Sequence, residues 1–63
     1  MRVVYYVQHG PYHSAFEVVR WENTEGRIRK LVVQTSIPIR SKAQVACAWW
    51  REQEKDRGHG KAD

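Results

Sequence analysis

The chain has few of the features that commonly stabilise or localise a short protein. Cys47 is its only cysteine, so no internal disulfide can form in these 63 residues. No stretch approaches the roughly 20 apolar residues of a membrane-spanning helix, and the N-terminal residues lack the pattern of a signal peptide. These absences predict one small domain held together by apolar packing, in the cytoplasm and with no membrane partner.

The residues that are present favour a folded, basic protein. Apolar residues make up 41% of the chain, and three Trp, three Tyr and one Phe can supply a core. Eleven Lys and Arg against seven Asp and Glu give a net charge of +4. That balance suits an anionic partner such as a nucleic acid, although it also serves solubility alone.

Three segments have the composition of β-strands, residues 2–8, 15–22 and 27–34. They are rich in β-branched and aromatic residues, which pack well on a pleated surface. Gly10 and Pro11 predict a turn after the first segment. The run from Asn23 to Gly26 predicts a β-hairpin between the second and third, because Asn starts turns through its side chain and Gly adopts the left-handed conformation.

One helix is predicted over residues 42–56. Ser41 and Gln44 form the pattern of a capping box at its start, and Gly58 and Gly60 are expected to end it. The predicted fold is therefore α+β, a three-stranded antiparallel sheet packed on one C-terminal helix (β-β-β-α). It forms a single domain over residues 1–56, followed by a disordered tail over 57–63.

The helix carries one apolar stripe at helical spacing, which we expect to face the sheet, with Val45 and Trp49 widening it. The residues of the stripe are Ala43, Ala46, Cys47 and Trp50. Apolar residues occur at both parities of the strands, and one helix can cover only one face of a sheet. The other face should therefore expose apolar and aromatic surface, which predicts a binding module.

Catalytic and metal-binding patterns are weak, and we expect no enzyme activity, no cofactor and no metal site. The candidate metal ligands are two histidines of a loop, one near the C-terminus and the lone cysteine, namely His9, His13, His59 and Cys47. The loop position of His9 and His13 disfavours zinc. Cys47 lies on the helix stripe, where burial would make it inert.

Basic residues on the predicted hairpin are more suggestive of a function than the metal and catalytic candidates. Arg forks suit phosphate oxygens and guanine edges, and a sheet can enter the major groove of double-stranded DNA. The candidate DNA-binding residues are Arg20, Arg27, Arg29 and Lys30, with Arg2 extending the patch. An alternative is that these cations pair across the strands with nearby carboxylates, Glu17, Glu22 and Glu25.

Exposed aromatic residues are a further candidate feature, because they can stack on the bases of single-stranded nucleic acid. The candidates are Tyr5, Tyr6, Trp21, Trp49 and Trp50. Most of them are expected in the core of so small a domain, so duplex binding ranks above single-strand binding.

Several runs together resemble the N-terminal arm-binding domain of phage and transposon tyrosine integrases. They cover the predicted hairpin and helix: Phe16 to Arg20, Glu25 to Lys30, Ser41 to Gln44 and Ala48 to Gln53. The resemblance implies three strands and one helix, with the sheet in the major groove of DNA. It carries the binding role onto Arg20, Arg27, Arg29 and Lys30.

Two other functions are consistent with the sequence. One is a small phage or mobile-element protein that binds and blocks a host protein, in transcription or CRISPR-type defence, because interfaces are rich in Tyr, Trp and Arg. The other is a homodimer that pairs its exposed sheets. The sequence alone leaves the choice between a DNA partner and a protein partner open.

Overall fold

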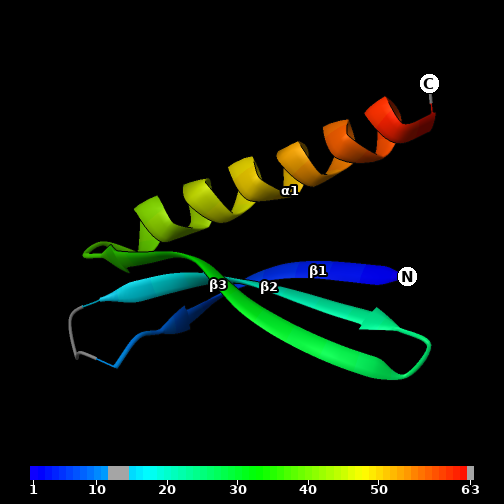
Figure 1. Cartoon of the computed structure of the whole chain (residues 1–63). Coiled ribbons are helices and arrows are strands. Elements are labelled where there is room, and N and C mark those ends of the chain that lie inside the picture. Colours follow the sequence, from blue (N-terminus) through cyan, green and yellow to red (C-terminus); the bar gives the residue numbers. More distant parts are fainter. Residues whose placement is uncertain (12–14, 63) are drawn as a thin grey trace.

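The computed structural model has one antiparallel sheet and one helix, which confirms the predicted β-β-β-α fold. It describes residues 1–11 and 15–62, with side chains described as far as Lys55. The sheet has the order β1-β2-β3, and the helix crosses one of its faces (Figure 1). The elements are β1 (Arg2–His9), β2 (Phe16–Thr24), β3 (Arg27–Ile37) and α1 (Arg40–Ala62).

The hairpin between β2 and β3 has the predicted turn. Asn23 Oδ1 accepts a hydrogen bond from the Gly26 N–H at 3.0 Å. Glu25 and Gly26 both have positive φ, 54° and 84°, as a two-residue type I′ turn requires. Thr24 and Arg27 therefore pair directly at the end of the hairpin, and this pairing sets which residues of β2 and β3 share a face.

The C-terminal part of β3 is irregular. Its pairing with β2 shifts between Phe16 and Val18 and again between Val18 and Val19, and Ser36 has a φ of 62°. Extra residues of this kind bend a strand and increase its twist. Two residues after the strand, α1 begins and lies across the sheet (Figure 1).

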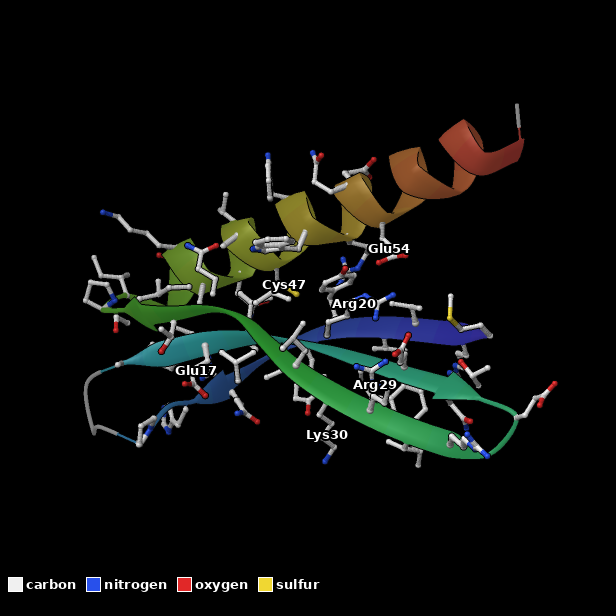
Figure 2. All side chains as sticks on the ribbon, viewed as in Figure 1. Glu17, Arg20, Arg29, Lys30, Cys47 and Glu54 are labelled. Atoms are coloured by element: carbon white, nitrogen blue, oxygen red, sulfur yellow. The ribbon has the colours of Figure 1, made fainter. Side chains whose placement is uncertain are left out.

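The core lies between the helix and the sheet. Tyr5, Val18 and Ile37 of the sheet are buried against Ala43 and Cys47 of α1. Ala46 and Trp50 are half-buried and pack against this cluster, so the predicted helix stripe lies where we expected it. Figure 2 shows Cys47 between the two layers.

Two residues that we expected to widen the stripe do not do so. Val45 is 70% exposed and Trp49 is 55% exposed. At 3.6 residues per turn, positions two and six residues beyond Ala43 lie on the opposite side of the helix from Ala43 and Cys47. Including Val45 and Trp49 in the stripe was therefore wrong.

The ends of α1 also differ from the prediction. The Ala43 N–H donates to the Ile39 carbonyl at 3.1 Å, so the helix begins at Arg40 and Ser41 lies within its first turn. The predicted capping box at Ser41 was therefore wrong. The helix also continues through Gly58 and Gly60, which we expected to end it. The division into a domain over 1–56 and a disordered tail over 57–63 stays a prediction.

Candidate nucleic-acid interface

The face of the sheet away from α1, here called the open face, is organised in rows across the three strands. Each row places one residue of β1, β2 and β3 directly opposite one another. Three successive rows are Arg2–Asn23–Ile28, Val4–Trp21–Lys30 and Tyr6–Val19–Val32. Val19, in the central strand, is 2% exposed, so its neighbours across the strands form the accessible surface.

Aromatic and cationic side chains meet on the open face. Arg2, Val4, Tyr6, Trp21 and Lys30 line one shallow depression of about 430 Å³. Figure 2 shows the Lys30 side chain pointing away from the helix. In the part of the chain that the structure describes, neither Arg2 nor Lys30 forms an ion pair. This combination suits a ligand with both a flat ring and a negative charge.

The open face has one carboxylate among its described residues, and that group lies in the next row along the strands. Glu17 is 9% exposed and pairs with Gln8 in the register. It accepts hydrogen bonds from Gln8 Nε2 at 3.0 Å and from Thr35 Oγ1 at 3.1 Å. Neutral donors therefore satisfy Glu17, and it does not neutralise Arg2 or Lys30 as a cross-strand partner.

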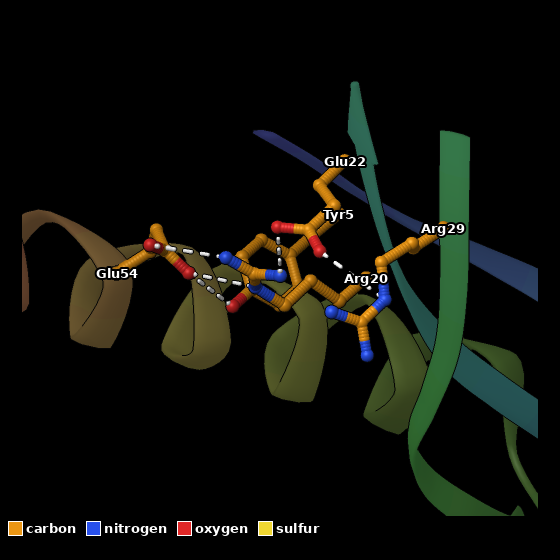
Figure 3. A network of polar contacts seen from close by, with 5 residues as sticks. All are labelled: Tyr5, Arg20, Glu22, Arg29 and Glu54. Carbon is orange, nitrogen blue, oxygen red and sulfur yellow. Dashed lines mark hydrogen bonds and ion pairs between the residues drawn. The ribbon is translucent and has the colours of Figure 1, made fainter. Parts of the chain in front are cut away.

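The opposite face contains a polar network that joins the sheet to the helix (Figure 3). Arg20 Nε donates to Glu54 Oε1 at 3.0 Å, and Arg20 Nη1 donates to Glu22 Oε2 at 3.0 Å. The Tyr5 hydroxyl donates to Glu54 Oε1 at 2.8 Å. Because the Arg20 side chain is only 17% exposed, its guanidinium serves the fold and is poorly placed to reach a ligand. We call these contacts the Arg20 network.

The Arg20 network shifts the titration of two of its members. Burial, followed by the hydrogen bond to Glu54 and its negative charge, raises the pKa of Tyr5 above the ordinary value of 10.0. The hydrogen bond to Glu54 raises the pKa of Arg20 although burial opposes this, and Glu22 adds to the rise. The folded state therefore favours a neutral Tyr5 beside a charged Arg20.

The remaining predicted cations lie near the hairpin. Arg29 is 84% exposed, and its Nε lies 3.7 Å from Glu22 Oε1, which makes a weak ion pair. Arg27 is exposed as the first residue of β3. The five predicted residues thus divide between the two faces: Arg2 and Lys30 are on the open face, Arg20 and Arg29 are on the helix side, and Arg27 is beside the turn.

Cross-strand charge pairing, the alternative to ligand binding, accounts for part of this set. Glu22 pairs with both Arg20 and Arg29. Glu17 was expected to pair in the same way, but its described partners are the neutral side chains of Gln8 and Thr35. Cross-strand pairing therefore involves Arg20 and Arg29 on the helix side of the sheet. It does not involve Arg2 and Lys30 on the open face.

A second hollow lies between α1 and β3. Leu31, Val33, Trp50 and Gln53 are among the residues that line its volume of about 360 Å³. Trp50, one of the lining residues, donates from Nε1 to Gln34 Oε1 of β3 at 2.9 Å. The helix packs mainly over β1 and β2, so Leu31 stays 61% exposed. This hollow is a mainly apolar groove beside an edge strand.

In the part of the chain that the structure describes, the candidate metal ligands do not form a cluster and the candidate nucleophile is not accessible. Among the described residues, no three His, Cys, Asp or Glu come together. His13 and the side chain of His59 lie outside those residues, so the expectation of no metal site stays a prediction. Cys47 is 3% exposed, and Arg51 Nη2 lies 3.8 Å from its Sγ. A nucleophile needs an accessible thiolate, which this burial does not provide.

Two carboxylates with structural roles were missed in the sequence. No structural role was predicted for Glu54, and Glu17 was expected to pair with a cation. Glu54 lies 34 positions from Arg20, and no local pattern signals such a contact. In contrast, the face of the sheet on which Lys30 and Arg29 each lie could be predicted from the sequence, because a two-residue turn after Thr24 fixes the pairing of β2 with β3.

Comparison with known proteins supplies no family. No protein-family model matches the chain, and neither the curated proteins nor the solved structures contain a significant match. The resemblance to the integrase arm-binding domain therefore stays a prediction. Among the described residues, no helix combines the length and the apolar character needed to cross a lipid bilayer.

Proposed function

We propose that this protein binds DNA through the open face and the β2–β3 hairpin, in the cytoplasm of a cell that carries a phage or mobile element. One observation carries the proposal. Arg2 and Lys30 share a depression with Tyr6 and Trp21 and have no ion-pair partner among the described residues. Cations without an ion-pair partner favour an anionic ligand, and the phosphates of a duplex supply that charge.

The size of the sheet fits double-stranded DNA. Neighbouring strands lie about 4.8 Å apart, so β1 and β3 are separated by about 10 Å. The major groove of B-DNA is about 12 Å wide and admits a two-stranded β-ribbon, so the β2–β3 hairpin can enter it while β1 lies at its border. The open face would lie toward the duplex, with Arg2 and Lys30 near the phosphates that border the groove, while α1 stays on the side away from the duplex.

The hairpin adds cations outside the open face. Arg29, on the helix side of the sheet, and Arg27, beside the turn, are both exposed, and they would contact phosphates that border the groove. Arg20 has a different role in this proposal, because it holds Glu22, which in turn lies beside Arg29. It stabilises the fold rather than contacting the ligand.

A salt titration of duplex binding tests the proposal. Fluorescence anisotropy with a labelled duplex would compare the wild type, an Arg2→Ala/Lys30→Ala double variant and an Arg40→Ala/Lys42→Ala control. The control removes the same charges from exposed positions in the first turn of α1. We expect the first pair to lower affinity and to reduce the salt slope by about 0.9 for each phosphate that the variant no longer neutralises. If the two double variants had equal effects, binding would depend on net charge alone, and this result would contradict the proposal.

A second candidate function, binding and blocking a host protein, is favoured by the surface of β3. Ile28 is 57% exposed and Leu31 is 61% exposed, on opposite faces of this edge strand. Edge strands with apolar surface readily pair with another chain, and the cations of β3 disfavour a second copy of itself as that chain. Capture of a single protein from host lysate that survives both nuclease and high salt would support this function over DNA binding.

A further inference from the structure

Tyr6 and Trp21 differ from the other buried or half-buried Tyr and Trp of the described chain in what their polar atoms contact. The Tyr5 hydroxyl bonds to Glu54, and Trp50 Nε1 bonds to Gln34. Among the described residues, the Tyr6 hydroxyl and Trp21 Nε1 have no hydrogen-bond partner. A half-buried Tyr or Trp without a protein partner keeps its polar end in solvent, and both side chains line the depression on the open face.

The ring faces of these two residues are also unoccupied by other rings. The aromatic contacts within the described chain join His9 to Phe16 at 4.7 Å and Trp49 to Trp50 at 5.0 Å. Neither contact includes Tyr6 or Trp21. The ring pairs among the described residues therefore lie elsewhere, and Tyr6 and Trp21 line the depression as two separate rings.

The spacing of the two rings fits unpaired bases better than stacked ones. Tyr6 and Trp21 lie on neighbouring strands, one row apart, and such diagonal neighbours are about 7–8 Å apart. Bases stacked within one strand of a duplex rise only about 3.4 Å each and show their edges rather than their faces. Two rings at twice that spacing can each take one base only when the strand is extended and unstacked.

Cations lie where the backbone of such a strand would pass. Lys30 is directly opposite Trp21 in its row, and Arg2 lies in the neighbouring row. Both line the same depression as the two rings. A groove of positive charge beside stacking rings is the general arrangement of proteins that bind single strands without base readout.

We propose that the open face also binds single-stranded nucleic acid, with Tyr6 and Trp21 each stacking on one unpaired base. The inference rests on the proposed function, because Arg2 and Lys30 contact phosphates in both. It adds a ligand class, an unpaired strand, and two residues that duplex binding does not require. A duplex presents base edges and phosphates to a protein, and it does not present the faces of its bases.

An oligothymidylate is the probe that tests this inference, because it forms little structure of its own. Fluorescence anisotropy would compare it with a hairpin duplex for the wild type, Tyr6→Leu and Trp21→Leu. Removal of either ring is expected to weaken oligothymidylate binding by about 5- to 100-fold. Duplex binding should change by less than about threefold, since phosphate contacts dominate it.

Matched variants separate stacking from folding. Trp49→Leu removes an exposed ring from α1, 55% accessible and away from the open face, and is expected to leave oligothymidylate binding unchanged. Tyr6→Phe and Trp21→Phe keep a ring and should retain most of the affinity. In a Trp49→Phe background, oligothymidylate should also quench tryptophan fluorescence, and substitution of Trp21 by Phe should abolish most of that quenching.

The outcomes separate the inference from the proposed function. Duplex binding without oligothymidylate binding would overturn the inference and leave the proposed function standing, whereas loss of both would overturn both. The inference would also be overturned if Tyr6→Leu bound oligothymidylate as tightly as the wild type and oligothymidylate did not quench the fluorescence of Trp21. Ring-dependent binding of the single strand, with Trp49→Leu unaffected, supports it.

Discussion

Arg20 and Glu54 join the central strand to the helix through two hydrogen bonds. Arg20 Nε lies 3.0 Å from Glu54 Oε1, and Arg20 Nη2 lies 3.5 Å from Glu54 Oε2. The Tyr5 hydroxyl shares the first of these oxygens. One carboxylate of α1 therefore fixes the helix against both β1 and β2, in a chain that has no disulfide to do so.

Replacement of Glu54 by Ala should destabilise the protein. It leaves the partly buried Arg20 and Tyr5 without a shared acceptor, and we expect the free energy of unfolding to fall by about 1–3 kcal/mol. Urea denaturation followed by circular dichroism measures this. Glu52→Ala is the matched control, because Glu52 is 66% exposed and contacts Lys55 at 3.8 Å. A change in stability as small as that of the control would contradict a structural role for Glu54.

Stability should also fall at high pH because of Tyr5. Its pKa is raised in the folded state above the ordinary value of 10.0, so the unfolded chain releases this proton first as the pH rises. The contribution is fully present below pH 10.0 and is lost as the pH rises through the folded-state pKa. We expect the unfolding free energy of the wild type to fall across this range more steeply than that of Tyr5→Phe. If the unfolding free energies of the two proteins fell in parallel as the pH rises, this would argue against a raised pKa of Tyr5 in the folded state.

Replacement of Arg20 should lower the stability of the protein, whereas replacement of the exposed hairpin arginines should lower its affinity for DNA. Arg20→Ala removes the centre of the Arg20 network and should lower the unfolding free energy by about 1–3 kcal/mol. Its effect on DNA affinity, measured where the protein is fully folded, should be small. The decisive observation against this assignment is a DNA affinity that disappears in Arg20→Ala while its unfolding curve stays that of the wild type.

Arg27→Ala/Arg29→Ala should behave in the opposite way. Both residues are exposed, so stability should change by less than about 0.5 kcal/mol. Affinity for a duplex and its salt slope should both fall, by about 0.9 in slope for each phosphate that these arginines neutralise. Anisotropy over a series of salt concentrations gives both quantities, and unchanged affinity would show that the hairpin does not contact DNA.

The turn of the hairpin offers a stabilising substitution. Glu25 has a φ of 54°, a conformation that costs roughly 1 kcal/mol for most residues but less for Asn. Glu25→Asn creates the Asn-Gly pair preferred in type I′ turns, and we expect it to raise the unfolding free energy by about 0.5–1 kcal/mol. Glu25→Gln, which removes the same charge, should give no such gain. Equal melting temperatures for the two variants would contradict this account.

Local chemistry predicted much of this fold. Asn23 and Gly26 marked the hairpin, and the spacing of Ala43 and Cys47 marked the buried side of the helix, because turns and helix faces depend on neighbours a few positions apart. The start of α1 was misplaced for the same reason. Ser41 has the chemistry of a cap, but the helix already begins at Arg40, immediately after Pro38 and Ile39.

The candidate site was only partly readable in the sequence. Lys30 and Arg2 were identified by charge, but charge alone did not separate them from Arg20, whose partner Glu54 is distant in the chain. The irregular pairing of β3 near Val33 and Ser36 had no sequence signal that we recognised. Such features depend on how the whole sheet bends against the helix, which a local pattern does not encode.

The short connection between β3 and α1 has a mechanical consequence. Only Pro38 and Ile39 separate the last strand residue from the first helical residue, and proline restricts the backbone there further. The end of β3 and the first turn of α1 also share the core, because Ile37 and Ala43 belong to the same buried cluster. The amides around these two residues should therefore become exposed together in hydrogen exchange, as one cooperative unit, rather than open in succession.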